Sequence, residues 1–351
     1  VERSAITFFS WAALGYSFKF VWAPLVDQLP LPVLSRALGR RRGWLLLAQL
    51  MVIVSITAMA LVDPSQGQQA LTCMALAAVA LGFSSATQDI VIDAYRIEVA
   101  QSREQSLLSA TYIAGYRIAM VISGAGALYL ATWLGDDTAY DYAAWRYTYL
   151  AMAGVMVLGV VTTLCVREPK ASEQRNYDYH AGDYGRFLGL FVLVVLAFIA
   201  AFSAGSSALS DIKASFSDGL SPVVKFLLEV TRLLVALLVA GIVAWCLVRL
   251  GVANKKMVNG TYIAPVKDFF SRYGVKMAVL LLLLVGTYRV SDIVLGIISN
   301  VFYLDIGFSK TQIASAVKTF GLFMVILGGF VGGIFSLKFG VVRMLLWGAI
   351  L

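Results

Sequence analysis

Residues 39–62 read GRRRGWLLLAQLMVIVSITAMALV, a run of three arginines followed closely by nineteen residues without a charge. A helix needs about 20 predominantly apolar residues to cross a hydrocarbon core about 30 Å thick. This stretch therefore predicts a membrane-spanning helix that carries a basic group at its N-terminal end.

Comparable apolar segments follow one another along the chain of 351 residues. We place them at about 4–22, 44–62, 70–88, 107–133, 145–166, 187–205, 223–248, 277–303 and 313–336, and a further one opens at 341. The composition agrees, because 60% hydrophobic and 14% charged residues lie outside the usual range of soluble domains. We predict an all-α polytopic membrane protein and disfavour a large soluble α-fold.

Basic residues fall almost entirely in alternate gaps between these segments. The gaps 23–43, 89–106, 167–186, 249–276 and 337–343 hold eighteen Lys and Arg residues, and the opposite gaps hold two. By the positive-inside rule the first set is cytoplasmic. The net charge of +8 then indicates contact with anionic lipid headgroups, and we infer no nucleic-acid function from it.

Residues suited to catalysis or metal binding are scarce. Cys73, Cys165 and Cys246 lie in apolar segments without metal-ligand or redox spacing, and the single His180 lies in a polar gap. An integral-membrane transferase or hydrolase is disfavoured because the cytoplasmic gaps hold no recognisable nucleophile and base. A channel is disfavoured because no short re-entrant filter sequence is present. We expect no enzyme, no metal and no cofactor.

A series of motifs adds specificity. They stand at 18–27 (FKFVWAPLVD), 39–46 (GRRRGWLL), 84–96 (SSATQDIVIDAYR), 115–117 (GYR), 264–270 (APVKDFF), 288–289 (YR) with Asp292, and 317–319 (VKT) with 321–322 (GL). In this order they resemble the AmpG-type muropeptide permeases of the major facilitator superfamily. The resemblance covers nearly all of the chain except 171–258.

The resemblance implies a major facilitator helical bundle in a bacterial inner membrane. It implies import of N-acetylglucosaminyl-anhydro-N-acetylmuramyl peptides by alternating access, with the proton gradient as driving force and no cofactor. The expected partners are a small glycopeptide substrate and membrane lipid, with no nucleic acid, and the protein is expected to function as a monomer. Acetyl-coenzyme A carriers belong to the same branch, so another anionic solute is the nearest alternative.

The domain organisation is predicted from the same segments. We expect an N-terminal bundle at 1–166 without its first helix, and the truncated start of a C-terminal bundle at 277–351. Between them, 167–276 is expected to form a cytoplasmic linker with an inserted helix pair and an amphipathic helix. We expect the natural protein to continue beyond both ends.

Charges inside apolar segments are the strongest functional indications, because each costs at least about 2.5–3.5 kcal/mol at the bilayer centre. Lys19 lies near a helix end, where snorkelling is an alternative explanation. The predicted substrate-binding residues are Lys19, Tyr112, Tyr116, Arg117, Tyr288, Arg289 and Lys318. Asp292 is the first candidate for proton coupling and Asp89 the second; an intrahelical ion pair of Arg289 with Asp292 is the structural alternative.

A further group is expected to act in gating. Asp89, Asp93 and Arg96 stand at i, i+4 and i+7, which places them on one stripe of a continuing helix. The predicted gating residues are Asp27, Arg40, Arg41, Arg42, Asp93 and Arg96. We expect Asp27, Arg41, Asp93 and Arg96 to form one cytoplasmic latch. The alternatives are that the arginines only fix topology and that 89–96 is an ordinary solvated helix end.

Overall fold

The computed structural model describes residues 14–101, 104–135, 140–170, 180–214, 221–288, 303, 306–307 and 320–350. The regular elements in these ranges are helices, and no β-strand occurs among them. In the first part of the chain they are α2 (Leu14–Gln28), α3 (Leu34–Leu38), α4 (Arg40–Ala60), η2 (Pro64–Gln66), α5 (Gln68–Val99), α6 (Gln105–Val121), η3 (Ile122–Gly126), α7 (Ala127–Leu134) and α8 (Tyr142–Cys165). The later ones are α10 (Ala181–Ala214), α11 (Pro222–Arg249), α12 (Lys255–Val258), η4 (Asn259–Ile263), α13 (Ala264–Tyr288), α16 (Gly321–Phe339) and α17 (Val341–Ile350).

Seven helices of the described ranges are long and apolar enough to cross a membrane. They are Arg40–Ala60, Gln68–Val99, Gln105–Leu134, Tyr142–Cys165, Gly182–Ser206, Leu227–Arg249 and Lys255–Thr287, and Phe323–Phe339 is a shorter apolar helix. The predicted all-α polytopic fold is thereby confirmed. Parts of the predicted segments 4–22, 277–303 and 313–336 lie outside the described residues.

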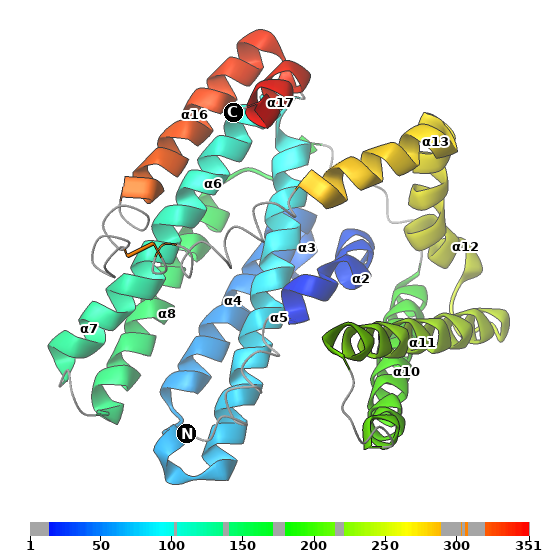
Figure 1. Ribbon diagram of the computed structural model, residues 1–351, viewed down its shortest axis with the longest axis horizontal. Helices are drawn as coiled ribbons and strands as arrows, with labels where there is room; N and C mark the ends of the chain where they lie inside the picture. The colour runs from blue at the N-terminus through cyan, green and yellow to red at the C-terminus, as the bar shows by residue number, and fades with distance from the viewer. Residues whose placement is uncertain are drawn as a thin grey trace. The chain divides into compact units, whose positions relative to one another are not determined.

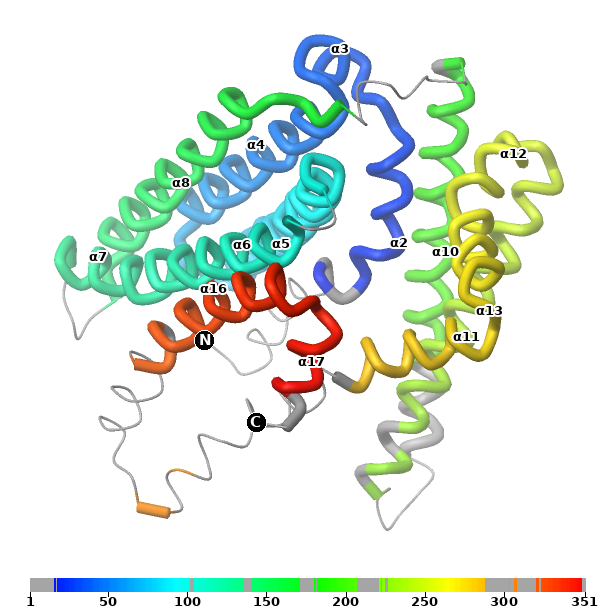
Figure 2. Tube along the Cα trace, turned by 90° about the horizontal axis from the view of Figure 1, so that it is seen from above, coloured from blue at the N-terminus to red at the C-terminus, as the bar shows by residue number. Residues whose placement is uncertain are grey.

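The chain divides into two compact units. Residues 176–283 form one, which contains the predicted helix pair, and residues 1–175 and 284–351 form the other. In the first-named unit α10 packs against α11 (Figure 1). In the other, α4 contacts both α5 and α8, α2 lies on α5, and α16 packs on α6 (Figures 1 and 2).

Small and polar side chains fill the contacts between helices of the larger unit. Ala48, Ser84, Ala86 and Thr148 are all buried. Such residues let helix backbones approach closely where lipid gives no hydrophobic driving force for association. Large apolar side chains instead cover the outside, as the exposure of Val54 (66%) shows, and this surface suits contact with lipid tails.

One helix is longer than its apolar sequence predicts. We expected the third segment to end at residue 88, but α5 continues to Val99 and includes Asp89, Asp93 and Arg96. The charged side chains remain in the helix because each has a partner on a neighbouring helix or along α5 itself. The helix end is therefore set by these partners and not by the limit of the apolar run.

Candidate functional site

Two charged clusters lie in the larger unit, toward the side that the sequence predicts to be cytoplasmic. The Lys19 cluster consists of Lys19, Asp89, Asp93, Arg96 and Tyr112, contributed by α2, α5 and α6. The ammonium group of Lys19 pairs with Asp89, and its Nζ lies 3.9 Å from Oδ2 of Asp93. The hydroxyl of Tyr112 donates to Oδ1 of Asp89 over 2.5 Å. One carboxylate thus has both a cationic and a phenolic partner.

The depth of this cluster is unusual for charged residues. Asp89 precedes the last residue of α5 by ten positions, which corresponds to about 15 Å along the helix axis. Its side chain is 18% exposed, and that of Lys19 is 34% exposed. Partly buried charges usually have a partner of opposite sign. Here the opposite charge across the α2–α5 contact is that partner.

Arg96 links the cluster to α6. Its guanidinium pairs with Asp93 at 3.3 Å and donates to Oγ of Ser109 at 2.8 Å. The same group lies 5.3 Å from the ring centroid of Tyr112, which is within the range of a cation–π contact. Nε of Arg96 is buried without a hydrogen-bond partner among the described residues. Three helices therefore meet at this cluster through charged and polar side chains.

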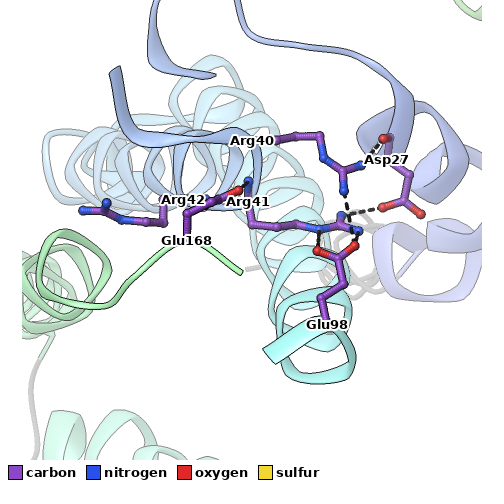
Figure 3. Close-up of polar contacts among 6 residues, drawn as sticks. All are labelled: Asp27, Arg40, Arg41, Arg42, Glu98 and Glu168. Atoms are coloured by element: carbon purple, nitrogen blue, oxygen red, sulfur yellow. Dashed lines mark hydrogen bonds and ion pairs between the residues drawn. The ribbon is translucent and has the colours of Figure 1, made fainter. Parts of the chain in front are cut away.

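The Arg41 cluster consists of Asp27, Arg40, Arg41 and Glu98 and joins the inner ends of α2, α4 and α5 (Figure 3). Arg41 bonds Oδ1 of Asp27 and Oε1 of Glu98, each at 2.5 Å, and its Nε donates to Oε2 of Glu98 at 3.0 Å. Arg40 bonds Glu98 at 3.2 Å and the backbone carbonyl of Asp27. Both arginine side chains are almost fully buried, at 2% and 4% exposure.

A reciprocal contact ties α4 to the end of α8. The carboxylate of Glu168 accepts from the backbone N–H groups of Arg41 (2.8 Å) and Arg42 (3.0 Å), at the N-terminus of α4 (Figure 3). Arg42 in turn donates to the carbonyls of Thr163 and Leu164 at the C-terminus of α8. An anion at a helix N-terminus and a cation at a C-terminus both complement the helix dipole. Each helix end thus supplies hydrogen-bond partners for backbone groups at the end of the other helix.

Gly39, just before α4, makes this arrangement possible. Its φ of 89° is in the left-handed region, and a Cβ there would lie 2.5 Å from Cδ of Glu168. Only glycine meets both the backbone and the space requirement at this position. Gly39 is therefore needed for the carboxylate of Glu168 to reach the helix end.

The structure divides the four residues that we expected in one latch. Asp93 pairs with Arg96 in the Lys19 cluster, whereas Asp27 and Arg41 pair in the Arg41 cluster. The helix period explains the division. Glu98 follows Asp89 by nine positions, which is half a turn away around α5, so it faces α4 while Asp89 faces α2.

Two functional residues escaped the sequence prediction, Glu98 and Glu168. The signal for Glu98 was charge balance, since three adjacent arginines need more than one acid at the same membrane face. The signal for Glu168 was its place directly after an apolar segment, where a carboxylate can reach a neighbouring helix end.

The remaining predicted residues are only partly described. Tyr116 is 55% exposed, and Arg117 has a buried Nε without a hydrogen-bond partner in the described part of the chain. Arg289, Asp292 and Lys318 lie outside the described residues, as does the side chain of Tyr288. Their predicted roles stay predictions. Within the described residues no group of three or more His, Cys, Asp or Glu side chains could hold a metal ion.

Comparison with known proteins identifies the family of this chain. The model of the Major Facilitator Superfamily matches residues 4–287. The anhydromuropeptide permease of Escherichia coli K12 is 29% identical over 348 residues, which are 99% of this chain and 51% of that protein. The putative transporter AmpG 4 of Rickettsia felis is 28% identical over 340 residues, 97% of this chain and 61% of that protein. The chain thus spans between half and two thirds of the length of these relatives.

Proposed function

Because the chain belongs to the Major Facilitator Superfamily, we propose that it is the part of a proton-coupled importer of anhydromuropeptides that carries the coupling site. It is a multi-pass protein of a bacterial inner membrane. The observation that supports the coupling step most strongly is the ion pair of Lys19 with Asp89, to which Tyr112 adds a hydrogen bond. The named substrate of the permease relative supports the choice of cargo.

The proposed coupling uses a change of partner at Lys19. A proton that arrives at Asp89 removes the charge that holds Lys19, and the freed ammonium can then bind a carboxylate of the substrate peptide. Asp93, whose Oδ2 lies 3.9 Å from the same ammonium, can pair with Lys19 when the substrate leaves. Proton and substrate would therefore arrive together. Arg117 and Tyr116, one helix turn beyond Tyr112 on α6, are proposed as further substrate contacts, and Asp292 is a second proposed proton carrier.

The Arg41 cluster is proposed as the latch of the inner helix ends. Its charge-assisted hydrogen bonds join α2, α4 and α5, and the contact between Glu168 and Arg42 extends the group to α8. Bonds of this kind can be made in one conformation and broken in another. Cysteine accessibility on the cytoplasmic side should rise in the full-length protein when Arg41→Met is introduced. Unchanged accessibility would leave the cluster as a packing element only.

The substrate proposal is tested with the full-length protein in proteoliposomes under an inward proton gradient. Labelled anhydromuropeptide should accumulate, and acetyl-coenzyme A should neither accumulate nor compete. A matched vesicle without the gradient should equilibrate the label but not concentrate it. Accumulation of acetyl-coenzyme A in place of the muropeptide would overturn the proposed cargo.

A further inference from the structure

Two exposed arginines of the smaller unit, Arg186 and Arg249, lie at the same end of its helix pair. Nε of Arg232 on α11 donates to the carbonyl of Phe202 on α10 at 2.9 Å, and the guanidinium lies 3.7 Å from the ring centroid of Phe202. Arg186 lies sixteen residues before Phe202, and Arg249 lies seventeen residues after Arg232. In two helices that run in opposite directions from this bond, Arg186 and Arg249 reach the same end. Both are exposed.

The chain after α11 adds an amphipathic helix at this end, formed by residues 255–273. Its inner side is fixed, because Met257 and Thr261 are buried and the ring of Tyr262 lies 6.1 Å from that of Phe187 at the start of α10. This contact fixes the rotation of the helix about its axis. A second apolar stripe is therefore left uncovered.

That uncovered stripe is formed by large apolar side chains at helical spacing. Ile263, Val266 and Tyr273 are 55%, 57% and 48% exposed, and the ring of Phe269 contacts that of Tyr273 at a tilt, with ring centroids 5.3 Å apart. Isolated exposed apolar residues are ordinary, but a continuous stripe indicates a surface that meets an apolar phase. Aromatic rings with a polar tip are typical of the interface between headgroups and acyl chains.

Cations lie beside the stripe. Lys255, Lys256, Lys267 and Arg272 are all exposed. The single acid between residues 249 and 276 is Asp268, and it pairs with Arg272 at 2.7 Å. The lysines therefore retain a net positive field at the edge of the apolar stripe. Both parts of an interfacial helix, an apolar face and a basic border, are present together.

A kink in α13 follows directly after residue 273. Gly274 has φ 71° and ψ 153°, inside what is otherwise the continuous helix α13, and the chain visibly changes direction within α13 in Figure 1. No neighbouring atom lies within 4 Å of the place of a Cβ at Gly274, so its backbone conformation and not crowding calls for glycine. The kink lets residues 255–273 lie along the membrane surface while the apolar residues after it enter the bilayer.

We propose that this basic amphipathic surface, residues 255–273 together with Arg186 and Arg249, binds the headgroups of anionic phospholipids in the cytoplasmic leaflet. The apolar stripe inserts between the acyl chains, and the lysines meet the phosphates. The indole of Trp245, 4.3 Å from the guanidinium of Arg249, lies at the same level as an interfacial anchor. This inference does not depend on the transported substrate.

The test compares phosphatidylglycerol with phosphatidylcholine of identical acyl chains, bound to the detergent-solubilised full-length protein and measured by native mass spectrometry. In K255Q/K256Q/K267Q the dissociation constant for phosphatidylglycerol should rise at least roughly tenfold, because each basic residue near an anionic surface contributes about fivefold. Binding of phosphatidylcholine should stay within about twofold, since its headgroup has no net charge for the lysines to bind.

The matched control removes three exposed cations of the other unit, in R36Q/R167Q/K170Q. It should leave phosphatidylglycerol binding nearly unchanged. The proposal is overturned if both triple variants lower the binding equally, or if the lysine variant weakens both lipids alike. Tighter binding of a short RNA than of the lipid at the same ionic strength would overturn it too.

Discussion

The two charged clusters each hold two acids and two cations, but they differ in exposure and in how the charges are paired. In the Lys19 cluster, two carboxylates lie within 3.9 Å of one ammonium, and the side chains of Lys19 and Asp93 are 34% and 38% exposed. In the Arg41 cluster, two guanidinium groups, each less than 5% exposed, share the carboxylate of Glu98. The cation between the two acids of the first cluster is partly exposed, and the cations of the second cluster are buried.

This difference determines what each cluster can do. A proton on Asp89 would remove the charge that pairs most closely with Lys19, and the partly exposed ammonium could then turn to another carboxylate. In the Arg41 cluster, protonation of Glu98 would remove a carboxylate that two buried guanidinium groups share, and weaker compensation of buried charges is costly in a protein interior. We infer that the Lys19 cluster changes charge during the transport cycle and that the Arg41 cluster holds the helix ends together until it opens as a whole.

The largest effect is expected from Asp89→Asn. The amide cannot carry a proton, so accumulation of substrate against its gradient should be lost, while exchange across the membrane persists. Uptake driven by an imposed proton gradient, compared with counterflow in the same proteoliposomes, measures the two activities. Asp89→Glu is the control and should retain accumulation. Normal accumulation in the asparagine variant would remove Asp89 from the mechanism.

A second prediction concerns stability. Arg41→Met should lower the free energy of unfolding by about 3–5 kcal/mol, because it removes the buried cation that Asp27 and Glu98 share. Lys19→Met should cost clearly less, since Lys19 is 34% exposed against 4% for Arg41, and Asp93 keeps Arg96. Denaturant unfolding in detergent gives both free energies. A double-mutant cycle of Arg41→Met with Glu98→Gln then gives the interaction energy between these two side chains. Equal costs for the two substitutions would remove the distinction between the clusters.

The helix-end contact allows a finer comparison. Glu168→Gln should lower the free energy of unfolding by about 1 kcal/mol, because the charged acceptor of two N–H groups at the start of α4 is lost. Glu104 is the residue directly before α6 and makes no side-chain cap there, so Glu104→Gln is the control for a helix-end acid without such bonds and should change little. The same unfolding measurement applies. A larger loss from the control would mean that helix-end charge, and not the observed bonds, matters.

The smallest effect is expected in the outer loop, far from both clusters. Hydrogen bonds from the hydroxyl and the backbone N–H of Ser65 lower the pKa of Asp63 below its ordinary 3.8, and Tyr140 adds a bond of 3.2 Å. A lowered folded-state pKa means a stabilising contribution that is present above pH 3.8 and is lost as the pH falls through the folded value.

The melting temperatures of the parent protein and Asp63→Asn should accordingly differ slightly at neutral pH and converge in acid. Burial and the bond to Asp63 raise the pKa of Tyr140 to about 12, so the contribution of Tyr140 should fall at strongly alkaline pH. A difference that grows in acid would contradict the assigned bonds.

The sequence predicted the spans and their chemistry because both depend on composition along one helix. Apolar length predicted helices such as α4 and α8 to within a few residues, and helical spacing predicted the pairing of Asp93 with Arg96. The family motifs contain Lys19 and Asp89, but they do not indicate that the two residues contact each other.

What the sequence could not predict depends on which helices touch. That Lys19 meets Asp89, and that Arg41 turns to Glu98 instead of Asp93, follows from the rotation of α2 and α4 about α5, which no local pattern specifies. The apolar run of the third segment ends at residue 88, and the helix continues past it to Val99, as the spacing of Asp89, Asp93 and Arg96 assumed. Arg289 and Asp292 remain predictions from sequence.

The central claim is that protonation of Asp89 and binding of substrate are linked. The most direct measurement is the dissociation constant of anhydromuropeptide for the full-length protein in detergent, determined by calorimetry across a range of pH. The parent protein should bind more weakly as the pH rises, because an ionised Asp89 holds Lys19, and Asp89→Asn should bind with an affinity that no longer depends on pH. The same pH dependence in both proteins would contradict the account.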